Sequence, residues 1–279
     1  MMSRELQLRI ASAIVMGIAV LAATWAGGIW FRSLAVIIML VVHYEFSTMA
    51  NAPARSPLAN AIGWLAVMAT ALFVLTSLPS MALAAIFIGA AGACFAGVTR
   101  GGGLWSATAV LYAGLAGLAL AEIRGDGLSG LFAMLFIYAI VWTADTLALF
   151  CGRALGGPKL APRISPGKTW SGAVFGAAAG VGAGVGTALA FRHGGGVMIP
   201  LVALALVIAS IIGDLFESWV KRRLGAKDSG HIIPGHGGVM DRVDGLVFAA
   251  FAAFVLGNVL PLADHAGVTD ELAARLLGL

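Results

Sequence analysis

The chain has 279 residues, of which 60% are hydrophobic and 11% are charged, and it contains 38 glycines. A mean hydropathy of +0.98 excludes a water-soluble globular domain and predicts a polytopic membrane protein. The net charge of +4 comes from cations in short loops between apolar segments, which is a topology signal, so we expect no binding of nucleic acid.

Nine apolar stretches are long enough to cross a bilayer. In chain order they are residues 10–29, 33–49, 58–78, 81–98, 104–121, 128–150, 170–191, 197–216 and 246–262. Pro79 is the main reason to divide the third stretch from the fourth, and eight or ten spans remain as alternatives. The predicted fold is therefore an all-α membrane protein with about nine transmembrane helices and polar loops.

The positions of Lys and Arg test this count, because these residues collect on the cytoplasmic side of membrane proteins. With the N-terminus inside, thirteen of the 17 face the cytoplasm, and the other side keeps Arg32, Arg124, Arg192 and Arg275. This split predicts an external C-terminus and places both polar loops in the cytoplasm. The first span reads as a retained helix, and no targeting extension is visible, which favours a bacterial plasma (inner) membrane.

No loop is long enough for a core of its own, so we expect one integral-membrane domain over residues 1–279. Within it we distinguish N-terminal helices (1–126), catalytic helices and loops (127–263) and a short C-terminal tail (264–279). Residues 269–279 are expected to form an amphipathic helix at the external interface. The seventh span has a ridge of Gly172, Gly176, Gly180 and Gly184. Close packing inside the bundle is the preferred interpretation of this ridge, and a homodimer interface is the alternative.

Polar residues gather in one stretch, residues 218–244, which reads SWVKRRLGAKDSGHIIPGHGGVMDRVD. Asp241 and Asp244 are three residues apart, which on a helix puts both carboxylates on one face. Magnesium takes one or two carboxylates and completes its shell with water and phosphate oxygens. The nearby cations would neutralise a triphosphate, and glycines would let the backbone come close to it, namely Lys221, Arg222, Lys227, Gly235, Gly237 and Gly238.

Three further carboxylates lie within or at the end of apolar spans. Asp214 and Glu217 end the eighth span, and Asp145 lies deep in the sixth. Burying a carboxylate costs several kcal/mol unless it is paired or bound to metal, so each is a candidate site residue. A structural salt bridge to a lysine or arginine in a neighbouring loop is the alternative for Asp214 and Glu217, and local hydrogen bonding by neighbouring threonines is the alternative for Asp145.

A second polar segment, residues 151–172, reads CGRALGGPKLAPRISPGKTWSG. Its cations suit anionic groups at the lipid surface, although a plain positive-inside loop is the alternative. Gly167-Lys168-Thr169 looks like the end of a Walker A loop, but Pro162 stands where the motif needs glycine, so we reject it. A zinc site at His231 and His236 lacks further ligands, and we expect His236 to donate a hydrogen bond to phosphate or to shape the loop.

These residues carry a resemblance to a known family. The signature of the phosphatidate cytidylyltransferases, also called CDP-diacylglycerol synthases, is matched position by position by Ser218, Lys221-Arg222, Lys227-Asp228, Pro234, His236-Gly237-Gly238 and Asp241-Arg242-Val243-Asp244. The segments 213–218 and 165–172 are similar to the family as well. One departure is Gly167, where the family more often has lysine. The resemblance covers the chain from Asp145 onward, and the first half resembles the family only in being hydrophobic, with Glu45 at a helix end.

The resemblance implies transfer of the cytidylyl group of CTP to phosphatidic acid, which gives CDP-diacylglycerol and pyrophosphate for phospholipid biosynthesis. It implies a requirement for Mg²⁺, with a monovalent cation as an open addition. Asp214 and Asp241 are the expected metal ligands, with help from Asp145 or Asp244, and Lys221 and Arg222 complete the expected catalytic set. The nucleotide is expected to contact Lys221, Arg222, Lys227, Asp228, His236, Gly237, Gly238 and Arg242. Ser165, Lys168 and Thr169 are expected near the lipid phosphate or the nucleotide.

Two other classes of function remain as alternatives. The first is a related CTP-dependent enzyme that acts on another lipid, such as an isoprenoid alcohol kinase or a CDP-archaeol-type synthase. The second is an ion-coupled transporter, which should show internal repeats and charges at the bilayer midplane. No repeat is visible in this chain, and its polar residues cluster towards one side.

Overall fold

The computed structural model describes residues 4–98, 102–191, 197–233, 237–259 and 272–277. Over these ranges the chain is almost entirely helical, which confirms the all-α prediction. The elements are α1 (Arg4–Ala26), α2 (Gly28–Met49), α3 (Ala52–Arg55), α4 (Pro57–Leu75), α5 (Pro79–Gly97), α6 (Gly103–Arg124), α7 (Leu128–Leu155), β1 (Lys159–Ala161), β2 (Ser165–Thr169), α8 (Trp170–Ala190), α9 (Met198–Leu224), α10 (Met240–Val259) and α11 (Leu272–Leu277).

Each of the nine predicted spans coincides with a helix. Eight helices in the described ranges, α2 and α4 to α10, are long and apolar enough to cross a membrane. The remaining predicted span is α1, whose apolar stretch Ile10–Ala26 is shorter. The division at Pro79 is confirmed, because Pro79 is the first residue of α5. Proline suits this position since its ring presets φ and its missing N–H is not needed there.

Three helix boundaries differ from the sequence prediction. Gly27 has a φ of 64°, a conformation that favours glycine, and it separates α1 from α2 before residue 29. Helix α9 continues to Leu224, beyond the predicted end at residue 216, and α10 begins at Met240 rather than at residue 246. Hydropathy marks only the apolar part of a helix, so the polar extensions were not predicted. These extensions carry several of the candidate site residues.

The second polar segment contains a β-hairpin that was not predicted. Strand β1 pairs antiparallel with β2, with Lys159 opposite Thr169 and Ala161 opposite Ser165. The Trp170 N–H donates to the Pro158 carbonyl at 3.0 Å and joins the hairpin to the start of α8. Strands of three and five residues are too short to give a readable alternation of apolar and polar side chains.

The chain forms two compact units, each built from two segments. Unit 1 comprises residues 1–121 and 223–243, and unit 2 comprises residues 122–222 and 244–279. Unit 1 contains α1 to α5 and most of α6. Unit 2 contains α7, the hairpin, α8, α11 and most of α9 and α10. The subdivision into residues 1–126, 127–263 and 264–279 stays a prediction.

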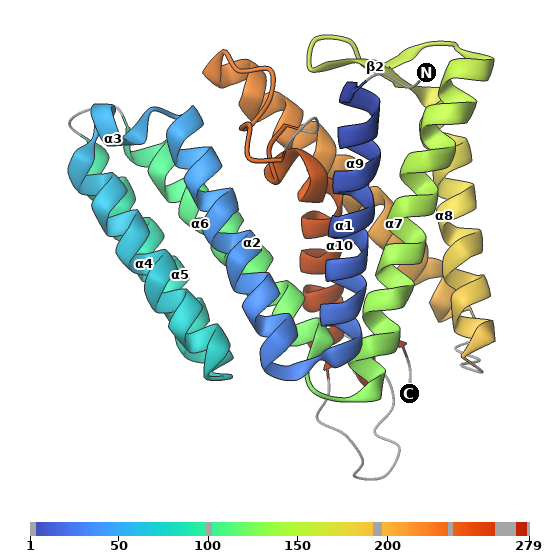
Figure 1. Ribbon diagram of the computed structural model, residues 1–279, viewed down its shortest axis with the longest axis horizontal. Helices are drawn as coiled ribbons and strands as arrows, with labels where there is room; N and C mark the ends of the chain where they lie inside the picture. Colours follow the sequence, from blue (N-terminus) through green and yellow to red (C-terminus); the bar gives the residue numbers. More distant parts are fainter. Residues whose placement is uncertain (1–3, 99–101, 192–196, 234–236, 260–271, 278–279) are drawn as a thin grey trace. The chain divides into compact units, whose positions relative to one another are not determined.

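In unit 1, α4 and α5 pack along each other, and α2 packs against α4 (Figure 1). Glycines let α6 approach its neighbours closely. A Cβ atom on Gly114 would lie 2.7 Å from Ile86 Cγ1 of α5, and one on Gly117 would lie 2.8 Å from Met39 Cβ of α2. Such close approach gives membrane helices the van der Waals contact that holds them together.

In unit 2, the glycine ridge of α8 packs along α7 (Figure 1). All four glycines of the ridge are buried. A Cβ atom on Gly172 would lie 2.6 Å from the Ala148 carbonyl oxygen, and one on Gly176 would lie 2.6 Å from that of Ala144. The preferred interpretation of the ridge, close packing inside the bundle, is therefore confirmed.

The predicted C-terminal helix is present as α11, which packs against α7 within unit 2. Its residues Leu276 and Leu277 are buried. The location of this helix at the external interface stays a prediction.

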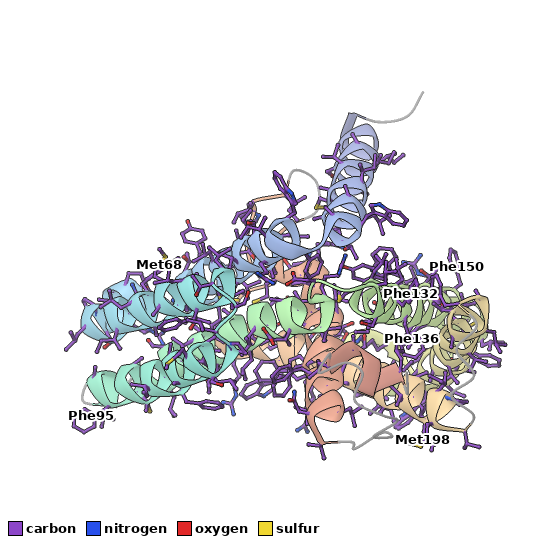
Figure 2. The ribbon with its side chains drawn as sticks, turned by 90° about the horizontal axis from the view of Figure 1, so that it is seen from below. Met68, Phe95, Phe132, Phe136, Phe150 and Met198 are labelled. Atoms are coloured by element: carbon purple, nitrogen blue, oxygen red, sulfur yellow. The ribbon has the colours of Figure 1, made fainter. Side chains whose placement is uncertain are left out.

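Large apolar side chains point outward from the helices. Phe95 of α5 is 84% exposed and Phe150 of α7 is 63% exposed, and both project away from their helices in Figure 2. Phe136 of α7 is only 1% exposed. An apolar outer surface of this extent is expected where lipid tails replace water as the solvent.

Candidate active site

Three aspartates of unit 2 form what we call the acidic cluster: Asp145 on α7, Asp214 on α9 and Asp244 on α10. Their carboxylates are close enough to repel one another. Asp145 is exposed, while Asp214 and Asp244 are half-buried, so none is sealed inside the bundle. Like charges gathered on membrane helices are stabilised by a cation or by taking up a proton. The structure thus brings together three of the four predicted metal ligands.

Lys168 on β2 supplies a cation for the acidic cluster. Its ammonium forms an ion pair with Asp214 Oδ2, and its charge also acts on Asp145 and Asp244. Ser218 Oγ lies 3.4 Å from Asp214 Oδ1, at the long end of the hydrogen-bond range. One lysine against three carboxylates leaves an excess of negative charge, which attracts a further cation.

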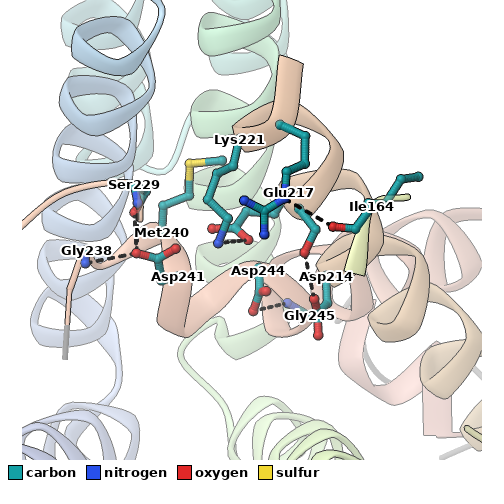
Figure 3. A network of polar contacts seen from close by, with 12 residues as sticks. Ile164, Asp214, Glu217, Lys221, Ser229, Gly238, Met240, Asp241, Asp244 and Gly245 are labelled. Atoms are coloured by element: carbon teal, nitrogen blue, oxygen red, sulfur yellow. Dashed lines mark hydrogen bonds and ion pairs between the residues drawn. The ribbon is translucent and has the colours of Figure 1, made fainter. Parts of the chain in front are cut away.

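The hairpin holds Lys168 in place because hydrogen bonds anchor it both at its base and at its turn. Thr169 is the N-cap of α8, and its Oγ1 accepts from the Gly172 N–H at 3.1 Å. At the hairpin turn, Arg222 Nε of α9 donates to the Ile164 carbonyl at 3.4 Å (Figure 3). The role that the structure shows for Thr169 is therefore a helix cap, and Ser165 is the first residue of β2.

Glu217 and Lys221 form an ion pair one turn apart on α9, with 2.7 Å between Lys221 Nζ and Glu217 Oε2 (Figure 3). The Glu217 side chain is 1% exposed and that of Lys221 is 14% exposed. Of the two interpretations left open for Glu217, the structure favours a structural salt bridge, although its partner lies on the same helix and not in a neighbouring loop as expected. A contact between Lys221 and a phosphate would have to come from a largely buried ammonium.

In unit 1, Asp241 lies in the first turn of α10 and organises the loop that precedes it. Its Oδ2 accepts from the Ser229 N–H at 2.9 Å, from Ser229 Oγ at 2.9 Å and from the Gly238 N–H at 3.0 Å (Figure 3). Gly237 has a φ of 85°, which favours glycine. The predicted Gly237-Gly238 turn is thus shaped by the carboxylate three residues later.

The other predicted nucleotide contacts of unit 1 lie at its surface. Lys227, Asp228 and Arg242 are exposed, which suits residues that meet a ligand. His236, with Pro234 and Gly235, lies outside the described residues.

Comparison with known proteins decides the family. The sequence model described as "Cytidylyltransferase family" matches residues 7–260. The chain belongs to the cytidylyltransferase family. The phosphatidate cytidylyltransferase of Brucella abortus biovar 1 (strain 9-941) is 45% identical over 262 residues, which cover 93% of this chain and 96% of the relative. The phosphatidate cytidylyltransferase of Haemophilus influenzae (strain ATCC 51907 / DSM 11121 / KW20 / Rd) is 41% identical over 156 residues, which cover 52% of this chain and 54% of the relative. The resemblance seen in the motifs is confirmed, and it extends into the first half of the chain.

The acidic cluster of this cytidylyltransferase-family chain suits magnesium in its chemistry. Among the described residues, no three His, Cys, Asp or Glu side chains converge closely enough to hold a metal ion by themselves. Magnesium needs only one or two carboxylates and usually takes its remaining ligands from water and substrate phosphates. The donor set therefore fits a magnesium ion bound together with a nucleotide better than a prebuilt structural site.

One buried carboxylate of this cytidylyltransferase-family chain was not predicted as a site residue. Glu45 on α2 is 1% exposed and accepts hydrogen bonds from two residues of the loop before α10, Ser229 and Val239, and from Met240, the first residue of α10. The available signal was a glutamate close to an apolar run, which is the same signal that selected Asp145 and Asp214. Its partners are almost 200 positions away in the sequence, so the connection itself was not visible.

Proposed function

We propose that this chain transfers the cytidylyl group of CTP to phosphatidic acid, giving CDP-diacylglycerol and pyrophosphate, a step of phospholipid biosynthesis. The observation that carries the proposal is the acidic cluster with Lys168 paired to Asp214. It occurs in a chain whose relative over 93% of its length is named phosphatidate cytidylyltransferase. The relative's name supplies the reaction, and the cluster supplies charged groups suited to it.

In this reaction an oxygen of the lipid phosphate attacks the α-phosphorus of CTP. A new P–O bond forms, the bond from the α-phosphorus to the oxygen that bridges to the β-phosphate breaks, and pyrophosphate leaves with the electron pair. The attacking phosphate is already anionic, so the protein needs no strong base. It must neutralise charge and hold the two phosphates in line.

One or two of the carboxylates of Asp145, Asp214 and Asp244 would hold Mg²⁺ in unit 2, with water and substrate phosphates as its remaining ligands. When bound, this ion would offset the negative charge of the phosphates and polarise a phosphoryl oxygen. A share of Asp241 in the metal site stays a prediction, since the described contacts of its Oδ2 are with its own loop. A monovalent cation beside magnesium also stays a prediction.

Lys168 is the residue best suited to exchange partners during the reaction. Its ammonium forms an ion pair with Asp214 Oδ2. This ammonium would serve as a charged hydrogen-bond donor to a phosphate of the lipid or the nucleotide if it exchanged Asp214 for that phosphate. Arg222 uses Nε–H for the Ile164 carbonyl, and its side chain is exposed, so other N–H groups of the guanidinium can serve a phosphate.

The residues of unit 1 are assigned to the nucleotide. Lys227 and Arg242 are exposed cations that suit CTP phosphates, with Asp228, His236, Gly237 and Gly238 in the same segment. Lys221 belongs to the same proposed set, although its charge also serves Glu217.

The membrane helices and the bacterial relatives support a multi-pass bacterial membrane protein. We assign the site to the cytoplasmic side, where CTP is found, with lateral access for phosphatidic acid from the inner leaflet. This orientation rests on the distribution of Lys and Arg. A homodimer stays a prediction, and the glycine ridge of α8 does not supply its interface because it is buried against α7.

A CTP-dependent lipid kinase or a CDP-archaeol-type synthase would use similar groups, but the relatives' names favour phosphatidate as the acceptor.

The test is pyrophosphate release by the detergent-purified protein with CTP and phosphatidic acid, with and without magnesium, beside Asp241→Asn. We expect release that needs both substrates and magnesium and that collapses in the variant. Turnover only when an isoprenoid alcohol or another lipid replaces phosphatidic acid would overturn the substrate, and no turnover with any lipid would favour a transporter.

A further inference from the structure

A carboxylate from the second helix of the chain caps the start of α10. Glu45 Oε1 accepts from the Val239 N–H at 2.9 Å, and Oε2 accepts from the Met240 N–H at 2.8 Å. The first N–H groups of a helix have no acceptor within the helix, and a buried end needs one from elsewhere. Here the acceptor lies 195 residues earlier than Met240 in the chain and is itself buried.

The glycines of the loop make room for this carboxylate. A Cβ atom on Gly230 would lie 2.8 Å from Glu45 Oε1, and one on Gly238 would lie 2.7 Å from Oε2. A Cβ on Gly238 would also collide with Ser229 Oγ. From the sequence, we expect Gly238 of the signature to approach a phosphate. The fold gives a second reason for glycine at this position, because a side chain there would displace Glu45 and Ser229.

Ser229 links Glu45 to Asp241. Its hydroxyl oxygen lies 3.1 Å from Glu45 Oε2 and 2.9 Å from Asp241 Oδ2. A hydroxyl has one hydrogen, so the two carboxylates share it in a three-centre arrangement. Glu45, Ser229, Gly238, Val239, Met240 and Asp241 thus form one connected set, which we call the Glu45 network, and all its members belong to unit 1.

We propose that Glu45 is a positioning residue for cytidylyl transfer. It fixes Ser229 and the first turn of α10, and through them it holds the Asp241 carboxylate in one orientation. The inference rests on the proposed function. It predicts that loss of the Glu45 carboxylate changes how Asp241 serves the reaction, beyond any effect on folding.

The test compares Glu45→Gln with Met39→Ala. Glutamine replaces one of the two acceptor oxygens with an NH₂ group, so either the Val239 N–H or both the Met240 N–H and the Ser229 hydroxyl lose an acceptor. Met39 lies on the same helix and is fully buried, and its truncation leaves a cavity without changing the Glu45 network. Both variants are expected to unfold at lower temperature, so stability alone does not separate them.

The kinetic constants for CTP and the magnesium concentration at half-maximal rate separate them. We expect Glu45→Gln to lower kcat by about 10- to 100-fold and to raise the magnesium requirement. Losses of this size are typical when a residue that orients a metal ligand by a hydrogen bond is replaced. Met39→Ala is expected to keep both values near those of the wild type. A Glu45→Gln protein with wild-type kcat and magnesium dependence, or a Met39→Ala protein with the same losses, would overturn the inference.

Ser229→Ala removes the hydroxyl that joins the two carboxylates and supplies an independent measurement. Alone it should lower kcat about tenfold, whereas in the Glu45→Gln background it should add little, because residues in one network are not additive. Fully independent effects would contradict the link.

If Glu45→Gln fails to fold, an unchanged kcat for Ser229→Ala still overturns the inference. A wild-type protein without CTP-dependent pyrophosphate release overturns the proposed function together with this inference, whereas an active wild type with unaffected variants overturns the inference alone.

Discussion

The Asp214 carboxylate forms an ion pair with the Lys168 ammonium and is close enough to repel the carboxylates of Asp145 and Asp244. A carboxylate at the end of an apolar run has two ordinary explanations, a structural salt bridge or a bound cation. The structure shows the salt bridge, and the two further carboxylates that face the same lysine support the proposal of a bound cation as well. Two substitutions separate the contributions of carboxylate and lysine.

Asp214→Asn should lower kcat on the order of 100-fold, since it removes a carboxylate charge that would hold the cation at the reacting phosphates. A magnesium titration of pyrophosphate release should also show a higher half-saturating concentration. Asp126→Asn is the matched control, because Asp126 precedes α7, whose first residue already lies about 25 Å from Asp145 along the helix axis. Equal losses in both variants would show that the acidic cluster has no special role.

Lys168→Gln should have the opposite effect on magnesium. Its ammonium competes with a cation for Asp214 Oδ2, so the variant should reach half-maximal rate at a lower magnesium concentration. At the same time the KM for CTP or phosphatidic acid should rise, because a phosphate loses its cationic partner. Lys159→Gln, an exposed lysine on the other strand of the hairpin, should change neither. A higher magnesium requirement in Lys168→Gln would contradict this competition.

At the scale of elements, unit 2 depends on the close approach of α7 and α8. A Cβ atom at position 176 would lie 2.6 Å from the Ala144 carbonyl oxygen and 2.8 Å from Ala148 Cβ, both on α7. Gly182 lies on the same helix α8, and a Cβ there would meet nothing within 4 Å. Position 176 therefore has no room for a side chain, whereas position 182 has, although the neighbours of the two glycines in the sequence are alike.

Gly176→Ala should reduce the free energy of unfolding by about 1–3 kcal/mol, because the helices must move apart. Gly182→Ala should leave it unchanged or raise it by up to about 1 kcal/mol, because alanine favours the helix. Thermal unfolding in detergent, followed by far-UV circular dichroism, measures both. Equal effects of the two substitutions would mean that the ridge does not pack as described.

The helices and part of the site were predictable from local signals. Apolar runs marked every spanning helix, Pro79 marked a helix start, and the glycine ridge marked a packing face. The hairpin was not predictable, because its strands are too short for a pattern. The partners of Glu45 were hidden for another reason: hydrogen bonds between residues 45 and 240 depend on tertiary structure, which periodicity does not report.

At the scale of the whole molecule, the chain is a membrane protein whose candidate residues lie on helices with apolar outer faces and in the polar segments between them. The proposed reaction joins a water-soluble nucleotide to a lipid, and we predict that the active residues are reached from the cytoplasm. The distribution of Lys and Arg makes this orientation a specific prediction for each helix end.

Cysteines placed at the two ends of unit 1 helices test the orientation. In a background of Cys94→Ser and Cys151→Ser, which removes both native free cysteines, we expect Ser80→Cys to react with an impermeant maleimide in intact cells. Ala54→Cys should react only after the membrane is opened. Both positions are exposed, and they lie near opposite ends of α4. The reverse labelling pattern would invert the topology and place the site outside the cytoplasm.

The transferred group itself is tested most directly with CTP labelled separately at the α- and γ-phosphates. Purified protein, phosphatidic acid and magnesium should move the α-label into the lipid fraction and leave the γ-label in pyrophosphate, because the bond that breaks lies between the α- and β-phosphates. If the γ-label enters the lipid instead, the chain is a CTP-dependent kinase, and the assignment of cytidylyl transfer is wrong.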